Sequence, residues 1–419
     1  MAGTPGTPRV LRAMNDRAAL DLLLEHGPLS RTRIGKLTGL SKPTASQLLA
    51  RLEAAGLVLA TGTTAGRPGP NAQLYSVNPA AAYVAGLDVT PIRIRAAVAD
   101  ITGRTVGEFE LPTPGRRAQG TVEQVVQAVD EAAKAAGLNR SDLHRVVIGT
   151  PGAFDPGTGR LRYASHLPGW HSTTVLDELA AALAVPLEYD NDVNLAAVAE
   201  QRVGAARDHE DFVLLWNEEG IGAAIVIGGR LHRGWTGGAG EVGFLPVPGT
   251  PLVRHVAKAN NGGFQELAGC NAVLRVAREL GLAIPGGRPL QDQAAALLAV
   301  ASGSVEAAEA AAAEEAAEPA AGDGTAAAHA ELLARIATGL AIGLASMVAV
   351  LDPELIVLTG SVIVAGGEPL RALIQAELAE LAVPRPRLVI GAVQEHPVLC
   401  GALQSALATT RDEVFDTSR

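Results

Sequence analysis

Apolar residues near the start of the chain recur at the spacing of helices. Leucines share one face of residues 15–26, a segment that should end before Gly27 and Pro28, a pair that stops helices. Ser30 is placed to cap a second helix over residues 31–38. The inward-facing residues of this second helix are expected to be Ile34 and Leu37. The pattern therefore predicts two short helices, each with one buried face.

A third helix is predicted directly after a tight turn at Gly39. Ser41 can cap this helix, and Pro43 falls in its first turn, where a missing N–H is tolerated. Its buried stripe is expected to comprise Ala45, Leu48, Leu49 and Leu52. A short turn followed by a helix with a polar amino-terminal half is typical of a helix-turn-helix, whose second helix enters the major groove. The predicted DNA contacts are the cap and the outward polar residues of this helix: Ser41, Lys42, Thr44, Ser46, Gln47 and Arg51.

Two strands, at residues 57–60 and 73–77, should follow the third helix as a hairpin. The connection between them holds Arg67 between Gly66 and Pro68, and an Arg on an extended loop is well shaped to enter a minor groove. We therefore predict a winged helix-turn-helix domain over residues 1–78, with Arg67 as a further DNA contact. The alternative is a three-helix protein-interaction domain with a surface hairpin.

The distribution of charge favours the DNA-binding interpretation. Residues 1–78 hold nine Lys and Arg against four Asp and Glu, a net charge of +5, whereas the whole chain carries −10, which leaves −15 for the remainder. A basic segment on an acidic body suggests a nucleic-acid-binding domain joined to a small-molecule domain. The 419 residues are 48% hydrophobic and 19% charged, which is typical of a globular protein with two or three domains.

Composition also predicts a cytoplasmic protein with no membrane partner. The only two cysteines, Cys270 and Cys400, lie far apart, which fits a reducing compartment. The first ten residues do not resemble a signal peptide. The apolar segment 329–351 contains charged residues at its start and is expected to be a buried helix rather than a membrane span.

After residue 78 the pattern changes to one of strands and helices. A Gly-rich turn, Gly149 to Gly152, should end the first run of elements. Before it, strands are predicted at 82–89, 92–100, 105–111 and 145–148, and a helix at 122–136. This order predicts an α/β domain with duplicated halves.

The most polar turn in this body is Asp190-Asn191-Asp192. The apolar run 183–187 predicts a buried strand before the turn, and apolar spacing over 195–203 predicts a helix after it. Ligands of open α/β sheets bind beyond the carboxyl ends of strands, and two carboxylates with an amide suit a polyhydroxylated ligand. Alternatively, these residues only turn the chain and cap the helix.

Several motifs follow the order found in the repressor, open-reading-frame, kinase (ROK) family, and the chain resembles this family over nearly its whole length. The motifs are Gly149-Thr150-Pro151-Gly152, Leu167-Pro168-Gly169-Trp170, Asp190-Asn191-Asp192-Val193-Asn194, the Gly-rich stretch 220–229 and Gly237-Gly238-Ala239-Gly240-Glu241-Val242-Gly243. The resemblance implies an actin/hexokinase-like (ribonuclease H-like) domain with sugar and ATP between two lobes. We place the first lobe at 79–191, joined by a C-terminal helix at 397–415, and the second at 192–396.

The resemblance also implies a set of sugar-binding residues. Asp192 stands at the position of the kinases' general base, and Asn191 beside it holds the sugar. Glu241 and Glu266 match two glutamates that bind sugar hydroxyls. The predicted binding set is completed by Gly152 and His166. The alternative is that these carboxylates are inherited and merely solvated.

The phosphate loop that the family's kinases share is broken in this chain. In place of Asp-Ile-Gly-Gly-Thr, the chain has Asp88-Val89-Thr90-Pro91-Ile92, so both glycines are absent and Pro91 offers no N–H. Phosphoryl transfer depends on positioning and charge stabilisation, so we predict no enzyme activity and a vestigial role for Asp192. The segment 356–361 resembles the family's nucleotide-flanking loop with one Gly replaced.

The family's zinc site is also predicted to be absent. Many members bind zinc through one His and three Cys, and the matching positions here are Phe244, Ala257, Ala259 and Phe264. We therefore expect no metal and no cofactor, with packing of the two phenylalanines in place of the metal.

Taken together, these patterns predict a sugar-responsive transcriptional regulator that represses carbohydrate uptake or catabolism genes. Its expected partners are a double-stranded DNA operator and a sugar or sugar-phosphate effector. Reading a palindromic operator requires two-fold symmetry, so we expect a homodimer or homotetramer. The alternatives are a bifunctional sugar kinase and a ligand-independent DNA-binding regulator with a vestigial cleft.

Overall fold

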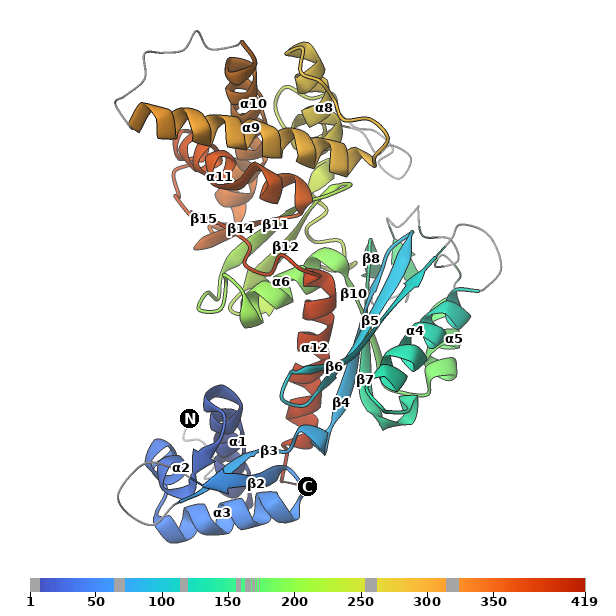
Figure 1. Ribbon diagram of the computed structural model, residues 1–419, viewed down its shortest axis with the longest axis vertical. Helices are drawn as coiled ribbons and strands as arrows, with labels where there is room; N and C mark the ends of the chain where they lie inside the picture. The colour runs from blue at the N-terminus through green and yellow to red at the C-terminus, as the bar shows by residue number, and fades with distance from the viewer. Residues whose placement is uncertain are drawn as a thin grey trace. The chain divides into compact units, whose positions relative to one another are not determined.

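The chain divides into two compact units in a computed structural model (Figure 1). The first unit comprises Met1–Gly149, Pro168–Tyr189 and Ala402–Arg419, and the second comprises Thr150–Leu167 and Asp190–Gly401. The structure describes residues 8–63, 72–113, 120–155, 160–162, 167, 170, 172, 174–252, 262–313 and 324–418. The predicted division into three domains remains a prediction.

The amino-terminal part of the first unit is a winged-helix fold, as predicted. It contains α1 (Pro8–His26), β1 (Leu29–Ser30), α2 (Arg31–Thr38), α3 (Lys42–Ala54), β2 (Val58–Thr63) and β3 (Gln73–Val77), with the strands in the order β1-β3-β2. Both predicted caps are confirmed, because the side chains of Ser30 and Ser41 accept hydrogen bonds from the backbone N–H groups of Arg33 and Thr44.

Two details of this fold differ from the prediction. Helix α1 begins at Pro8, earlier than residue 15. Leu37 is 38% exposed rather than inward-facing, because Ile34 alone of the pair reaches the shared core of this domain. Arg67 lies outside the described residues.

The rest of the first unit is built on a five-stranded sheet in the order β10-β7-β4-β5-β6. Its strands are β4 (Tyr83–Val89), β5 (Arg93–Asp100), β6 (Thr105–Pro112), β7 (Leu143–Thr150) and β10 (Leu187–Asn191). Short elements η1 (Pro79–Ala81) and η2 (Arg140–Asp142) precede β4 and β7. Helices α4 (Thr121–Ala135) and α5 (Val175–Leu183) lie along one face of the sheet (Figure 1). Helix α12 (Pro397–Val414) packs on β4, where the backbone at Leu403 leaves no room for a side chain at Gly86.

The second unit contains a sheet with the order β13-β12-β11-β14-β15. Its strands are β11 (Phe212–Asn217), β12 (Ile221–Ile227), β13 (Arg230–Leu231), β14 (Leu355–Thr359) and β15 (Arg387–Ile390). Helix α6 (Asp192–Val203) precedes β11. The remaining elements of this unit are β8 (Ala153–Asp155), β9 (Arg160–Arg162), η3 (Val242–Phe244), α7 (Phe264–Ala268), α8 (Cys270–Glu279), α9 (Leu290–Ala313), α10 (Gly324–Leu351) and α11 (Ser361–Leu381).

The two sheets repeat one topology, so the predicted duplication is confirmed. In each sheet, three sequential strands form an antiparallel meander, β4-β5-β6 or β11-β12-β13, and the first of them pairs in parallel with the next strand, β7 or β14. The turn between β4 and β5 therefore corresponds to the turn between β11 and β12.

Helix α10 is long and apolar enough to cross a membrane by length and composition. Within this fold, 56% of the most apolar 18-residue stretch of α10 is buried. The residues that it contributes to the core of the second unit include Leu333, Leu340 and Leu344. Such burial is typical of the core helix of a folded domain.

Candidate functional site

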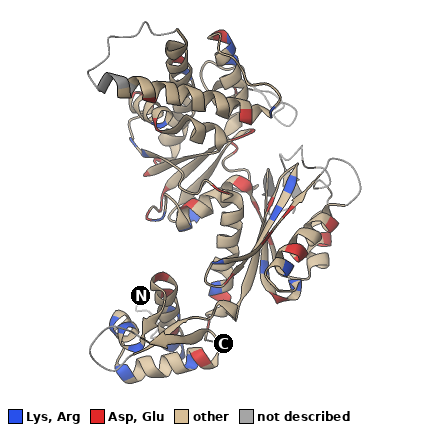
Figure 2. Ribbon diagram, in the orientation of Figure 1, with Lys and Arg blue, Asp and Glu red and all other residues tan. Residues whose placement is uncertain are grey.

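Helix α3 and its cap Ser41 carry the predicted DNA-contacting residues, and Lys and Arg residues occur on both α2 and α3 (Figure 2). Lys42 and Gln47 are exposed there. The hydroxyl groups of Ser41 and Thr44 lie 2.8 Å apart and bond to each other at the start of the helix. Ser46 accepts a hydrogen bond from Arg31 Nη1 at 3.0 Å. This contact places the guanidinium of Arg31 beside the outward face of α3.

Arg51 differs from the other predicted DNA contacts because it forms an internal ion pair. Its Nη2 atom lies 2.7 Å from Oδ1 of Asp16, whose side chain is only 3% exposed. Asp16 also accepts a hydrogen bond from Thr417 at 3.0 Å. The pair therefore holds α1, α3 and the segment after α12 together. Sequence reasoning did not identify this pairing or Arg31, since each depends on contacts between segments far apart in the chain.

The strand before the polar turn was misplaced by the sequence prediction. Of the predicted strand 183–187, only Leu187 is in a strand, because Leu183 ends α5 and Ala184 takes the left-handed conformation that closes that helix. Strand β10 begins only at Leu187 and includes Asp190 and Asn191. A short apolar run fits the end of a helix as well as a strand, and here the helix prevailed. The predicted helix after the turn is confirmed as α6.

Asn191 caps α6, as the alternative interpretation of this turn proposed for it. Its Oδ1 accepts hydrogen bonds from the N–H groups of Val193, at 2.9 Å, and Asn194, at 3.2 Å. Its Nδ2 donates to the carbonyl of Gly152 at 3.0 Å. Two residues of the predicted binding set are therefore in contact, although one of them has a structural role in addition to any ligand contact.

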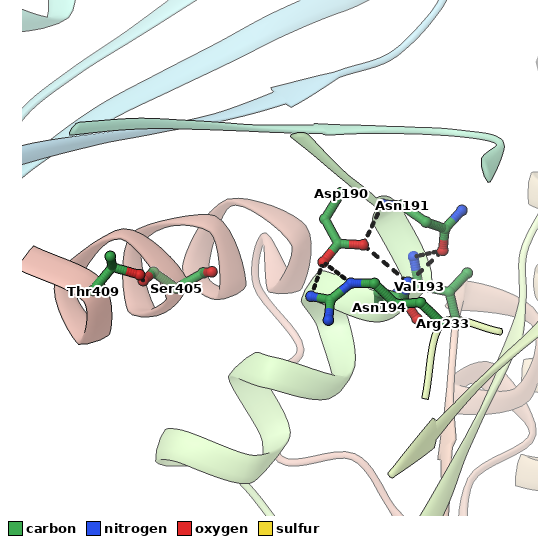
Figure 3. Close-up of polar contacts among 7 residues, drawn as sticks. All are labelled: Asp190, Asn191, Val193, Asn194, Arg233, Ser405 and Thr409. Carbon is green, nitrogen blue, oxygen red and sulfur yellow. Dashed lines mark hydrogen bonds and ion pairs between the residues drawn. The ribbon is translucent and has the colours of Figure 1, made fainter. Parts of the chain in front are cut away.

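Asp190 is the centre of a polar cluster at the end of β10 (Figure 3). The Asp190 carboxylate accepts hydrogen bonds from Arg233 Nη2 at 2.6 Å and from Asn194 Nδ2 at 2.9 Å. The side chain of Asp190 is 11% exposed and that of Arg233 is 52% exposed. Because Asp190 is paired in this way, it fixes the start of α6 to the segment that leads toward Glu241. Arg233 was not predicted, since it lies 43 residues from its partner.

The segments that carry Asp192, Glu241 and Glu266 converge on the first residues of β12. Val193 lies against Gly222, where a Cβ would be 3.2 Å from Val193 Cγ2. The turn before Glu241 is joined to β12 by a hydrogen bond from Ala223 N to Gly240 O at 2.8 Å. Gln265, next to Glu266, accepts a hydrogen bond from Ile221 N at 2.6 Å. Residues 221–223 thus form a common support for all three segments.

Glu241 and Glu266 are both half-buried. Burial raises the pKa of the Glu241 carboxyl above its usual value, because the charged form loses contact with water. A partly desolvated carboxylate binds a hydroxyl group more strongly than one in bulk water does. His166 lies outside the described residues.

The broken phosphate loop forms a tight turn that bonds to itself. Thr90 N donates to the carbonyl of Arg93 at 2.9 Å, and Arg93 N donates to Thr90 Oγ1 at 3.2 Å. Thr113 donates its hydroxyl to the carbonyl of Pro91 at 3.1 Å. The backbone donors of Thr90 and Arg93 are therefore engaged within the turn, and Pro91 has none to offer.

The position of the family's zinc site is occupied in part by apolar packing. Phe264 is fully buried in the core of the second unit and contacts Gly343 so closely that a Cβ there would lie 2.3 Å from its ring. Phe264 N donates to the carbonyl of Leu245, beside Phe244. Among the described residues, no three His, Cys, Asp or Glu side chains form a group suited to a metal ion. Ala257 and Ala259 lie outside the described residues.

Helix α12 joins the two units as one continuous element. In the second unit, Gly401 packs on α6 so closely that a Cβ would lie 1.8 Å from the carbonyl oxygen of Leu195. After α12 ends, Phe415 is buried in the core of the winged-helix domain, and the guanidinium of Arg17 lies 5.7 Å from its ring centroid. The residues of α12 up to Gly401 therefore belong to the second unit, and those from Ala402 belong to the first.

A second link ties strand β10 to the end of α12 within the first unit. Arg145 on β7 pairs with Glu188 on β10 and with Glu413 on α12, the latter at 2.7 Å. The Arg145 side chain is 10% exposed. Removing either carboxylate would leave part of a buried guanidinium unpaired, so this cluster holds the three elements in a fixed arrangement.

A winged helix joined to a duplicated α/β domain with a polar strand end defines a class of protein in which a DNA-binding head accompanies an actin/hexokinase-like body. The ROK family model matches residues 84–407, and the chain belongs to that family. A MarR family model matches residues 14–67, in agreement with the winged helix. The predicted family and fold class are therefore confirmed.

Three comparisons illustrate the range of similar proteins. A putative xylose repressor of Caldicellulosiruptor sp. (strain Rt8B.4) is 28% identical over 58% of this chain, and the match spans only 61% of that repressor. The crystal structure of a ROK hexokinase from Thermus thermophilus has a TM-score of 0.61 at 26% identity, covering 79% of this chain and 99% of the hexokinase. A ROK family transcriptional regulator, a homolog of the E. coli MLC protein, has a TM-score of 0.67 at 18% identity and covers 95% of this chain and 96% of its own, which shows a shared fold.

Proposed function

We propose that this protein is a sugar-responsive transcriptional repressor of carbohydrate uptake or catabolism genes, acting in the cytoplasm as a homodimer or homotetramer. The observation that carries the proposal is the path of α12, which packs on α6 at Gly401 and leads to Phe415 in the winged-helix core. The similarity to a protein named as a xylose repressor supports it. The effector is a sugar or a sugar phosphate.

The winged helix is the proposed operator-binding part. Lys42, Thr44 and Gln47 are exposed on α3, the helix that enters the major groove in a helix-turn-helix. Ser41 and Ser46 support this face from the helix start and from the contact with Arg31. Arg67 is the proposed minor-groove contact. Arg51 contributes by holding α3 on Asp16.

The proposed effector contacts are Asn191, Asp192, Glu241 and Glu266, with Gly152 and His166. Carboxylates accept hydrogen bonds from sugar hydroxyls, and the partial burial of Glu241 strengthens such a bond. Asp192 stands at the first position of α6, where the helix N-terminus favours its negative charge. We assign it hydroxyl binding without productive proton transfer, because the phosphate loop of the first unit is closed on itself.

The proposed coupling runs through α6 and α12. A sugar held by Asp192 changes the position of α6 that is favoured, and Leu195 on the same helix contacts Gly401 of α12. A shift of α12 should also move Phe415, which directly follows the helix. The ring of Phe415 is part of the winged-helix core. A ligand alters operator affinity only if it prefers one of two arrangements of these elements.

The test is calorimetry with a panel of sugars and sugar phosphates on the full chain, combined with operator titration. We expect one class of ligand to bind and to change operator affinity. Asp192→Asn should weaken that ligand about 10- to 100-fold, since it removes a charge-assisted hydrogen bond worth about 1.5–3 kcal/mol, and should leave ligand-free operator binding intact. Asp208→Asn is the matched control, because it removes an exposed charge from the segment that follows the end of α6.

Two results would contradict the proposal in different ways. If no sugar or sugar phosphate binds or shifts the operator complex, the chain is a ligand-independent regulator. A second candidate function is a bifunctional sugar kinase. The similarity to a hexokinase and the presence of Asp192 favour this candidate. ATP-dependent phosphorylation of a hexose that Asp192→Asn abolishes would establish it.

A further inference from the structure

Two parallel strands of the second unit end side by side next to the start of α11. Strands β11 and β14 pair in parallel, with Trp216 opposite Thr359. Asn217 ends β11 and Glu218 follows it, where Gly360 and Ser361 follow β14. Helix α11 begins at Ser361 and is interrupted by a kink at Gly367, whose φ of 56° and ψ of −154° are not helical. Ligands of α/β sheets bind beyond the carboxyl ends of parallel strands, and free N–H groups at a helix start attract anions such as phosphate.

In this chain a carboxylate from the β11–β12 turn occupies that helix start. One oxygen of Glu218 accepts a hydrogen bond from Ser361 N at 2.8 Å. The other oxygen accepts one from the hydroxyl of Ser361, also at 2.8 Å. Both are charge-assisted bonds, which are stronger than neutral ones. Glu218 therefore supplies to α11 the negative charge that a bound phosphate would supply.

The backbone that carries Glu218 is held in place from two further sides. Cys270 Sγ donates to the carbonyl of Glu218 at 2.7 Å. Asn217, which is fully buried, donates its Nδ2 to the carbonyl of Ala268 at 2.9 Å. These two contacts fix the backbone that carries Glu218 beside Ser361.

We propose that Glu218 is a built-in anion that closes this edge of the second unit to phosphate groups. It thereby makes this unit exclude nucleotides and other polyphosphates as ligands. A phosphate near Ser361 would have to displace two charge-assisted hydrogen bonds and would be repelled by the displaced carboxylate. The exposed Glu219 beside it adds a second negative charge to the same turn. The inference rests on the proposed function, since it treats the body as a sensor with no need for ATP.

The experiment compares the full-length protein with Glu218→Ala, using inorganic pyrophosphate and magnesium AMPPNP as probes in calorimetry and in thermal unfolding. Glu219→Ala is the matched control, because it removes the same charge from the same turn without being a contact of Ser361 among the described residues. We expect Glu218→Ala to bind pyrophosphate at least tenfold more tightly than the native chain and the control. Its Tm should fall by about 2–4 °C and recover when pyrophosphate is added.

A third variant protects the test against simple misfolding. Glu218→Gln keeps the size of the side chain and removes its charge, so we expect pyrophosphate affinity between those of the native chain and Glu218→Ala. Equal pyrophosphate binding by the native chain and all three variants would overturn the proposal, as would the absence of binding to folded Glu218→Ala and Glu218→Gln. The sugar response of the operator complex is measured in the same samples. If the response is missing while the pyrophosphate results hold, the proposed function fails and the role of Glu218 stands.

Discussion

The equivalent hairpin turns of the two sheets are both closed, but by different means. The β4–β5 turn is closed mainly by its own residues, since Thr90 and Arg93 bond to each other across Pro91, and Thr113 adds bonds from outside the turn. The β11–β12 turn has one bond of its own, from Glu218 N to Gly220 O, and is otherwise held by residues from other parts of the chain, namely Ala268, Cys270 and Ser361. The donors of the first turn are therefore engaged mainly by local contacts, and the second turn is held mainly by tertiary contacts.

This difference predicts how each turn responds to substitution. A locally closed turn is expected to tolerate the loss of one contact, because its neighbours in sequence remain. The turn that depends on other elements is expected to be sensitive to small changes in those elements, because several of its contacts depend on one close approach of two strand ends. Three substitutions test the contrast.

The largest effect is expected from Gly360→Ala. Gly360 has φ 89° and ψ 147°, a region that side chains other than glycine rarely occupy, and a Cβ there would lie 2.3 Å from the carbonyl oxygen of Asn217. Strain and overpacking together should cost about 3–5 kcal/mol of unfolding free energy. Urea unfolding followed by circular dichroism measures it.

Gly249→Ala is the control for Gly360→Ala. Gly249 also has a positive φ, 83°, but nothing lies within 4 Å of its Cβ position. We expect a cost of about 1–2 kcal/mol from backbone strain alone. If the two variants lose equal stability, the close approach of β11 and α11 does not contribute to holding the second turn.

The same contrast explains which features the sequence could predict. The caps Ser30 and Ser41 were placed correctly because a helix cap depends on the next three residues. The absence of the two glycines of the family's phosphate loop could be read directly from the sequence, which has Thr90 and Pro91 in this segment. The contact of Glu218 with Ser361 spans 143 residues, and that of Asp190 with Arg233 spans 43. Nothing in the sequence next to Glu218 or Asp190 indicates which residue each side chain contacts.

An intermediate effect is expected from Thr90→Val in the first turn. Val keeps the shape of Thr and removes the hydroxyl that bonds to Arg93, while the backbone bond from Thr90 N to Arg93 O remains. The cost should be about 1 kcal/mol in urea unfolding. Thr63→Val, at an exposed strand position, is the control and should change stability by less than about 0.5 kcal/mol. A loss above about 3 kcal/mol for Thr90→Val would show that the first turn is not robust.

The smallest effect is a pH dependence that only the second turn should show, through the thiol that bonds to Glu218. Burial raises the pKa of Cys270 to about 11, and the charges of Glu218 and Glu219 add to this rise. The unfolded thiol ionises near its usual pKa of 9.0, so between pH 9 and 11 the unfolded chain releases a proton that the folded chain keeps. The contribution of Cys270 to stability is therefore complete below pH 9 and is lost as the pH rises.

Cys270→Ser isolates this contribution, since serine can donate to Glu218 O but does not titrate in this range. Stability should fall between pH 8 and pH 10.5 by less than about 1 kcal/mol more in the native chain than in Cys270→Ser, a modest amount because the group retains some contact with solvent. Urea unfolding at the two pH values measures the difference. Glu218→Ala should reduce it, because removing the nearby carboxylate lowers the pKa of the thiol. Identical pH dependence in all three proteins would mean that the thiol does not sense the charge in this turn.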